Sequence, residues 1–516
     1  MFNIHKFSHH FVVEEPDGYL QNAIDDYSRQ FLLQTQSFKL WNNKVVKKQH
    51  KMFGVRTTHP LQYRFHINMF DHFMTFMSQK GFTHYNITKE PMYTPKPADF
   101  KIATSKTPWK NQPAIIDYLV DNGDAGDDAV AKVIELQAGQ GKTLCALFAA
   151  QRIGVRTGLI IKAMYVERWL DDLARPGGVY ELNKSEITVV RGSKNLANLI
   201  ELGLNDELEY KFIVFSNKTI ALYYKDYIKG VDMDKYHGVM PWDLMKVLGI
   251  GLRITDEAHQ DFHSCFKVDL FSHVPKTISL SATLEPDDAF LKEMYKVIYP
   301  KHLRYGGATY EVYVDVIAVP FKIDREVKQQ VRFNQRGMLS YSQNVYEDSI
   351  LSSKKRTQSY LEMITFLVDR YFIQKRYKDY RLIIFSGRVE TCATIVAHLQ
   401  TIYPNLRIGK YTEEESYEIL DELDIVVSTP ISAGTAVDIS KLQVCLNLVA
   451  LGSTQANLQM LGRLRELHGV DINPLFLYIY CVDIEKHIYY HKKRRDETFK
   501  GKVLSYVDLE PAVFSV

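Results

Sequence analysis

The stretch from Glu135 to Thr143 reads Glu-Leu-Gln-Ala-Gly-Gln-Gly-Lys-Thr, and it lies between an apolar run that ends at Leu136 and a helix-like run from Leu144 to Arg152. A strand, a glycine-bearing turn and a helix start are the parts of a phosphate-binding loop. The glycines let backbone N–H groups point inward, and the helix N-terminus adds the positive end of its dipole. The pattern demands an α/β fold. It predicts that Lys142 reaches the β- and γ-phosphates and that the Thr143 hydroxyl ligates Mg²⁺.

Short apolar strands alternate with amphipathic helices over two successive regions. The first six expected strands are 133–136, 157–161, 187–190, 212–215, 252–255 and 277–280, and those of the second region include 382–385, 425–428, 444–449 and 475–480. This alternation predicts two mostly parallel sheets covered by helices. Tyr93 to Pro97 reads as a linker, and Gly306-Gly307 marks a second break. We therefore expect an N-terminal module over 1–95 and two α/β domains over 96–304 and 305–516.

Composition narrows the class of protein without naming a function. Hydrophobic residues make up 46% and charged residues 24% of the 516, which is typical of a soluble globular protein. A net charge of +3 is too small to indicate a nucleic-acid partner by itself. The five cysteines lie far apart and form no CxxC pair, so we expect reduced thiols, no structural zinc and a cytoplasmic location. We find neither a signal peptide at the N-terminus nor an apolar run of about 18 residues that would span a membrane.

Two adjacent carboxylates, Asp256 and Glu257, follow the expected strand 252–255. In this position Asp256 is able to hold Mg²⁺ through water, and Glu257 to polarise the water that attacks a γ-phosphate. An exposed acidic turn is the alternative, which the phosphate-binding loop makes much weaker. His259 and His263 stand four residues apart, but no glutamate lies between them in the zinc-hydrolase arrangement, so we do not expect a metal site there.

Two further segments gain meaning only beside the first two. Ser281-Ala282-Thr283 follows an apolar run, and small hydroxyl side chains there are able to link a nucleotide-sensing carboxylate to a nucleic-acid groove. Gln459 to Arg465 reads Gln-Met-Leu-Gly-Arg-Leu-Arg and offers guanidinium groups for a transferring phosphoryl group. Taken alone, the first is an ordinary tripeptide and the second a basic solvated helix.

In this order the four segments resemble the superfamily 2 helicases of the DEAH/DExH class, over about 100–480. Leu136 stands where the generic phosphate loop has glycine, and this fits the leucine that many of these helicases carry. Weaker matches follow in the correct order: a glutamine segment at 109–112, motif Ia at 159–169 without its usual proline, motif Ib at 213–219, motif IV at 383–388, and motif V at 428–439 with Ala436 at a usual glycine.

The resemblance implies ATP and Mg²⁺ as cofactors and assigns a role to each matched residue. The expected catalytic residues are Lys142, Asp256, Glu257, Gln459, Arg463 and Arg465, with Thr143 and Asp256 as the Mg²⁺ ligands. Nucleotide contacts are expected from Gln112, Ala138, Gly139, Gln140, Gly141, Lys142, Thr143, Gly434 and Asp438. Coupling of the nucleotide to the nucleic acid is expected from His259, Ser281 and Thr283. Sequence-independent contacts to a strand are expected from Arg168, Ser216, Thr219, Ser386, Arg388 and Thr429.

One departure concerns the second arginine of the family pattern Gln-x-x-Gly-Arg-x-x-Arg. Glu466 occupies its place, and the arginine stands at 465 instead. If this segment is helical, neighbouring residues differ by about 100° in direction, so Arg463 and Arg465 face different ways. We expect Arg463 to serve the γ-phosphate.

The flanks of the motor core point to nucleic acid. Residues 38–56 mix aromatics and basic residues, followed by a helix-like stretch over 62–80, and bases stack on aromatic rings. The 492–495 cluster is a second basic patch. With an acidic-to-basic run into a long helix over 346–377, these features resemble phage helicases of the UvsW type, which remodel branched DNA.

That finer resemblance implies a monomeric motor on single-stranded or branched DNA. Its other partners would be replication and recombination proteins of a phage or its host. An RNA helicase, a translocase subunit of a restriction system and a catalytically weak binding module remain the alternatives.

Overall fold

The computed structural model describes residues 2–516 except 40–44, 124–128, 138, 259–261, 285–287, 308–310, 324–325, 333–338, 413–414, 416–418, 434–438, 468 and 510–513, and it leaves out the side chains of 36–39, 45, 46, 48, 332 and 339. The chain divides into two compact units. The first comprises 1–35, 49–136 and 140–308, and the second 36–48, 137–139 and 309–516.

The N-terminal module is built on a five-stranded mixed sheet in the order β5-β6-β2-β1-β7. Its strands are β1 (Phe2–Lys6), β2 (His10–Glu14), β5 (Gly54–Arg56), β6 (Gln62–His66) and β7 (Tyr85–Lys89), and its helices are α1 (Gly18–Phe31) and α2 (Phe70–Gln79). Asp17 caps α1 by accepting a hydrogen bond from the backbone N–H of Leu20 at 2.8 Å. A separate hairpin pairs β3 (Leu33–Lys39) with β4 (Val45–Lys51).

The expected helix over 62–80 is only half right. Residues 62–66 form β6, which is buried along its whole length, and the helix begins at Phe70. Tyr63 and Phe65 pack into the core on one face of β6, while Gln62, Arg64 and His66 are buried on the other. A strand buried on both faces lacks the period-two pattern that would have distinguished it from a helix start.

The N-terminal module shares one hydrophobic core with the first α/β domain. Buried polar contacts join them as well. His9 lies 3.3 Å from the Thr277 hydroxyl, and the Tyr227 hydroxyl donates to Gln62 Oε1 at 2.6 Å. The Arg64 guanidinium stacks 4.5 Å from the ring of Trp242. Separating these parts would expose polar groups that are satisfied only across their interface.

The first α/β domain contains a six-stranded sheet in the order β10-β11-β9-β12-β13-β8, in which every pairing is parallel. Its strands are β8 (Val130–Glu135), β9 (Thr157–Ile161), β10 (Ile187–Val190), β11 (Phe212–Ser216), β12 (Leu252–Thr255) and β13 (Lys276–Ser281). Its helices are α3 (Gln112–Val120), α4 (Lys142–Ile153), α5 (Val166–Ala174), α6 (Ser193–Leu204), α7 (Asn217–Ile228), α8 (Leu244–Val247), α9 (Phe262–Asp269) and α10 (Ala289–Ile298).

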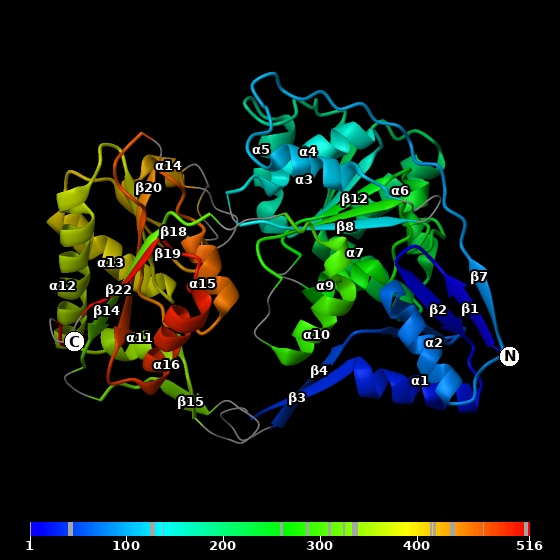
Figure 1. The fold of residues 1–516 in the computed structure, drawn as a ribbon, viewed down its shortest axis with the longest axis horizontal. Helices are drawn as coiled ribbons and strands as arrows, with labels where there is room; N and C mark the ends of the chain where they lie inside the picture. The colour runs from blue at the N-terminus through cyan, green and yellow to red at the C-terminus, as the bar shows by residue number, and fades with distance from the viewer. Residues whose placement is uncertain are drawn as a thin grey trace. The chain divides into compact units, whose positions relative to one another are not determined.

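Helices cover both faces of this sheet, which explains why its central strands read as continuous apolar runs. Figure 1 shows α3, α4 and α5 along one face, and α7, α9 and α10 along the other, the side on which the N-terminal module lies. The carboxyl ends of all six strands therefore meet at one edge, where ligands of such folds bind.

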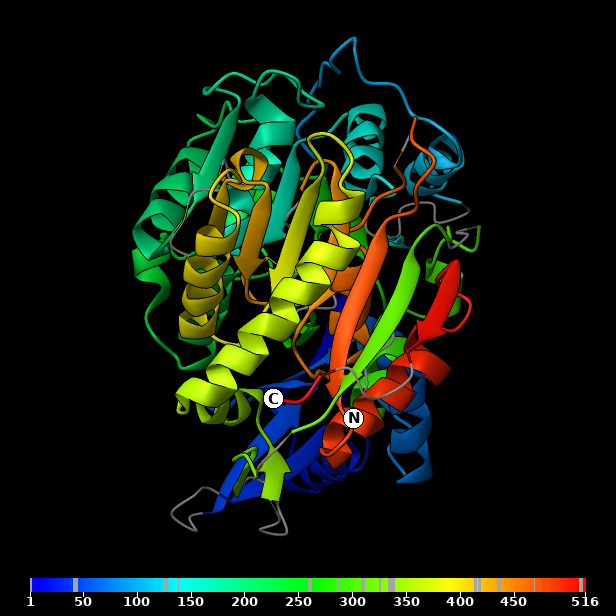
Figure 2. The same cartoon turned by 90° about the vertical axis from the view of Figure 1, so that its left-hand side faces the viewer.

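The second α/β domain contains a seven-stranded parallel sheet in the order β18-β19-β17-β20-β21-β14-β22. Its strands are β14 (Asp315–Phe321), β17 (Arg381–Phe385), β18 (Ile408–Tyr411), β19 (Ile425–Ser428), β20 (Leu442–Asn447), β21 (Leu475–Cys481) and β22 (Ser505–Asp508), with a hairpin of β15 (Gln330–Arg332) and β16 (Leu339–Tyr341). The helices are α11 (Gln343–Leu351), α12 (Lys354–Tyr371), α13 (Val389–Ile402), α14 (Ile419–Glu422), α15 (Thr454–Leu461) and α16 (Glu485–Lys493). Figure 2 shows the long yellow-green α12 lying across the strands.

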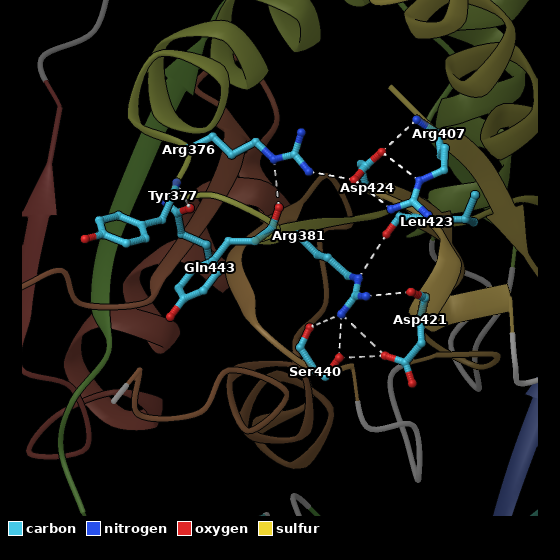
Figure 3. A network of polar contacts seen from close by, with 10 residues as sticks. Arg376, Tyr377, Arg381, Arg407, Asp421, Leu423, Asp424, Ser440 and Gln443 are labelled. Atoms are coloured by element: carbon cyan, nitrogen blue, oxygen red, sulfur yellow. Dashed lines mark hydrogen bonds and ion pairs between the residues drawn. The ribbon is translucent and has the colours of Figure 1, made fainter. Parts of the chain in front are cut away.

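Arginines tie together the amino ends of β17, β19 and β20 (Figure 3). Asp424, just before β19, accepts hydrogen bonds from Arg376 at 2.6 Å and from Arg407 at 3.2 Å. Arg381 donates to the backbone carbonyls of Asp421, Leu423 and Ser440. These contacts fasten the end of the sheet opposite the motif-bearing carboxyl ends, so they are structural.

The predicted fold class is confirmed: two tandem RecA-like parallel-sheet domains follow a small α+β module. The five cysteines are free, and four of them are buried. Among the described residues, no helix combines the length and apolar character needed to cross a bilayer.

Candidate active site

The phosphate-binding loop follows β8 and leads directly into α4, as the sequence predicts. Gly139 and Gly141 have φ angles of 92° and 78°, which side chains other than glycine rarely adopt. A Cβ on Gly141 would lie 2.4 Å from Nε2 of Gln112. Both glycines are therefore required by the backbone path, while Ala138 lies outside the described residues.

Gln112 is buried and fastened to this loop. Its Nε2 donates to the backbone carbonyl of Gln140 at 3.2 Å, and its Oε1 accepts from the backbone N–H of Trp109 at 3.1 Å. Trp109 is half exposed, and the Lys110 ammonium lies 4.7 Å from its ring. The residue expected to contact adenine thus also supports the loop that would hold the phosphates.

Lys142 and Thr143 occupy the first turn of α4. The Lys142 ammonium donates to the carbonyl of Leu136 at 3.1 Å, so the side chain folds back over the loop. This holds a cation at the helix N-terminus, within the ring of backbone N–H groups that suits a polyphosphate.

Asp256 and Glu257 end β12 at the same edge. Asp256 Oδ1 accepts from the backbone N–H of Glu257 at 2.8 Å, and Oδ2 accepts from the indole N–H of Trp169 at 2.9 Å. Burial and the charge of Glu257 raise the pKa of Asp256, and the indole bond and the Lys142 charge oppose that rise. Glu257 has a φ of 49°, an uncommon left-handed conformation for a residue with a side chain. Such strain recurs where a side chain must be aimed at a reaction.

Backbone hydrogen bonds bring three of the predicted motifs together. The N–H of Leu136 donates to the carbonyl of Ser281, and the N–H of Ala258 donates to that of Leu280, each at 3.0 Å. Ser281 is buried, and its hydroxyl donates to the carbonyl of Thr283 at 2.7 Å. The two expected coupling residues therefore shape one turn beside the carboxylates. The third, His259, lies outside the described residues.

A cavity of about 20 Å³ lies beside the two carboxylates. Side chains that sequence reasoning did not single out line it, among them Lys162, Asn217, Ser264 and Cys265. Trp169 was likewise missed as a partner of Asp256, although it stands next to Arg168 in the motif Ia match. Only its position in the fold, on α5 against the end of β12, shows this role.

The donor set suits Mg²⁺ held by a nucleotide. Each Asp256 oxygen accepts one hydrogen bond, and carboxylate oxygens have further lone pairs for a cation or its water shell. Within the described part of the chain, no group of three or more His, Cys, Asp or Glu side chains is arranged as a protein-only metal site. The Thr143 hydroxyl and Asp256 are therefore the residues that would hold Mg²⁺ together with phosphate oxygens.

The candidate nucleic-acid contacts of the first domain are mostly hydroxyl groups inside the fold. Ser216 and Thr219 are buried where β11 meets α7, and the Thr219 hydroxyl accepts from the backbone N–H of Gly192 at 2.8 Å. Arg168 is partly exposed on α5. In this geometry the hydroxyls hold the shape of the turn.

The second domain shows the same pattern. Ser386 is buried, and its hydroxyl donates to Glu347, which also accepts from the N–H of Gly387 at 2.7 Å and from Thr391 at 2.8 Å. Arg388 pairs with Asp348 and, at 3.2 Å, with Glu390. The buried Thr429 hydroxyl lies 3.0 Å from that of Ser432. Gly434 and Asp438 lie outside the described residues.

The segment with the displaced arginine is not the helix that the sequence suggested. Helix α15 ends at Leu461, so Gln459 is helical, whereas Arg463 and Arg465 lie in the turn and extended chain beyond it. Arg463 is buried, and its Nε donates to the Gln459 carbonyl at 3.3 Å. The 100° argument does not apply here, because the chain leaves the helix one residue before Arg463.

The basic cluster 492–495 is also not a simple surface patch. Arg494 is buried, donates to Asn457 Oδ1 and to the Val449 carbonyl at 2.8 Å each, and lies over the Tyr478 ring. It fastens α15, the helix that precedes Arg463, so its role is structural.

No protein-family model matches this chain, and no curated protein sequence does. Solved structures similar to it include the Hef helicase domain of Pyrococcus furiosus, at 13% identity and a TM-score of 0.43 over 75% of this chain and 98% of that one. S. cerevisiae Dbp5 bound to Gle1 and IP6 has 11% identity and a TM-score of 0.47 over 78% and 90%. Mss116p bound to single-stranded RNA and AMP-PNP has 13% identity and a TM-score of 0.48 over 82% and 83%.

Proposed function

We propose that this chain is an ATP-dependent motor of the superfamily 2 helicase type. It would move on single strands and remodel forked or branched DNA during recombination, repair or replication. One observation carries the proposal. The phosphate-binding loop, the Asp256–Glu257 pair and the Ser281–Thr283 turn lie on three neighbouring strand ends, joined by backbone hydrogen bonds.

The proposed roles follow from this geometry. The loop amides and Lys142 bind the triphosphate, and Thr143 and Asp256 hold its Mg²⁺. Glu257 orients and polarises the attacking water, for which its unusual backbone conformation positions it. Trp169 keeps Asp256 in place through its indole N–H. Arg463 supplies a guanidinium for the transferring phosphoryl group.

The preference for branched DNA rests on the sequence of the N-terminal module alone. RNA is the main alternative, because phosphate and sugar contacts carry no base preference. Steady-state ATP hydrolysis should be measured with single-stranded DNA, duplex, fork, four-way junction and RNA as stimulators. We expect forks and junctions to stimulate most. Stimulation by RNA alone would make the chain an RNA helicase, and hydrolysis unaffected by any nucleic acid would refute the motor.

A further inference from the structure

Helix α9 lies against the proposed catalytic carboxylates. Ser264, Cys265 and Val268 on this helix line the same small cavity as Asp256 and Glu257. The helix also follows these carboxylates closely in the chain, since it begins at Phe262. Its position therefore bears directly on the space in which a water molecule would attack.

The N-terminal module holds α9 near its start. His50 on β4 and His263 on α9 form a hydrogen bond of 2.6 Å between Nδ1 and Nε2, and their rings stack with centroids 4.8 Å apart and 21° between planes. One ring must donate and the other accept, so the contact has a defined direction. It joins the hairpin β3–β4 to the helix beside the active site.

The module also holds α9 at its end. His66 on β6 lies 3.6 Å from Asp269, the last residue of α9, and Asp269 pairs with the buried Arg253 on β12. Figure 1 shows α9 on the face of the sheet toward the module. Contacts from β4 and β6 thus grip a short helix at both ends, while its middle lines the catalytic cavity.

The hairpin is also the part of the module for which the sequence predicts nucleic-acid contact. Its strands and their flanks carry Lys39, Lys44, Lys47, Lys48 and Lys51 together with Trp41 and Phe53. A strand bound there would pull on β4, and β4 is connected to α9 through His50 and His263.

We propose that nucleic acid bound to the β3–β4 hairpin accelerates ATP hydrolysis through α9, with His50 and His263 as positioning residues that transmit the signal. This inference rests on the proposed function, since it concerns regulation of that active site. Neither histidine touches the nucleotide in this scheme. Their effect is on the placement of α9 relative to Asp256 and Glu257.

The test compares H50A, H263A and the double variant with the unmodified protein, in ATP hydrolysis with and without a forked DNA. Basal hydrolysis and the DNA concentration for half-maximal stimulation should stay the same. The stimulated maximum should fall about fivefold, the coupling that one side-chain hydrogen bond supports. The double variant should lose no more than either single one, because both break the same contact.

Two further variants make the result specific. H50N combined with H263Q replaces the bonding nitrogens with amide groups at similar reach, and it should restore stimulation. H72A is the matched control, because His72 bonds to Tyr27 inside the module and makes no printed contact with α9. It should behave like the unmodified protein.

Normal stimulation in H50A and H263A would overturn the inference while leaving the motor intact. A proportional loss of basal hydrolysis would do so as well, by showing a merely structural role, and so would a change confined to the half-maximal DNA concentration. If no nucleic acid stimulates the unmodified protein, the proposed function fails first and the inference fails with it.

Discussion

Replacing Asp269 with asparagine should destabilise the first compact unit severely. Asp269 is buried between His66 of the N-terminal module and Arg253 of β12, and Arg253 is only 3% exposed. D269N would leave that guanidinium in the interior with no carboxylate. Breaking a buried ion pair in this way costs about 3–5 kcal/mol, because the remaining charge stays desolvated.

A matched variant in the same unit separates this effect from the loss of any buried carboxylate. Asp226 is also buried and pairs with Lys235 at 2.6 Å, but the Lys235 side chain is 43% exposed. In D226N the ammonium would stay hydrated, so the loss should be about 1 kcal/mol or less.

Urea unfolding followed by tryptophan fluorescence suits the comparison, because all four tryptophans lie before residue 243. The two losses should differ by at least about 2 kcal/mol at pH 7. Burial opposes ionisation of Asp269, but Arg253 and His66 outweigh it and lower its pKa. Its stabilisation is therefore full above a pH of about 4, the pKa of an unfolded aspartate, and is lost as the pH falls further. D269N unfolding at the same urea concentration as D226N would refute the reasoning.

Four other substitutions test the site and the second unit. K142A should abolish ATP hydrolysis with the circular dichroism spectrum unchanged, because Lys142 is the cation held at the loop; near-normal turnover would contradict its role. E257Q should keep nucleotide affinity but slow turnover by orders of magnitude, and a twofold effect would remove Glu257 from catalysis. R463A should lose more single-turnover rate than R465A, by up to about 10³-fold, the value of a transition-state guanidinium, and the reverse order would exchange their roles. D424N should cost about 1–2 kcal/mol at pH 7, a difference that disappears in acid unfolding between pH 4 and 2: burial opposes ionisation, but Arg407 and Arg376 lower the pKa of Asp424 to about 2, and a pH-independent loss would contradict this.

The sequence was a good guide to the two parallel sheets. Three expected strands of the first region, 157–161, 187–190 and 252–255, match β9, β10 and β12 at both ends. Strands covered by helices on both faces are apolar at every position, and each stands between polar helix termini, so their limits are sharp. The glycines of the phosphate loop were equally legible, because their positive φ angles admit few other residues.

Partners distant in the sequence were not predictable. Trp169 beside Asp256, Gln112 beneath the loop and Glu347 behind Ser386 each act through a contact that only the tertiary fold creates. The displaced arginine shows the other kind of failure. The segment around Gly462 was read as a helix, but α15 ends before it, and helix ends depend on capping contacts that residue patterns specify weakly.

The separability of residues 1–95 was the least secure sequence inference. A composition break at Pro95–Pro97 suggests a linker, yet His10, Arg64 and His66 are buried in contact with the first α/β domain. Polar residues in an interface read as surface residues in a sequence, because nothing local shows that another part of the chain covers them.

Movement along a strand is the central claim, and displacement of streptavidin from biotinylated oligonucleotides measures it without requiring duplex unwinding. Single-stranded DNA and RNA, each labelled at the 5′ or the 3′ end, should be compared with ATP, with AMP-PNP and with the K142A variant. We predict displacement of streptavidin from one end of DNA, only with ATP and only by the unmodified protein. ATP hydrolysis that is stimulated by DNA but displaces streptavidin from neither end would contradict the account.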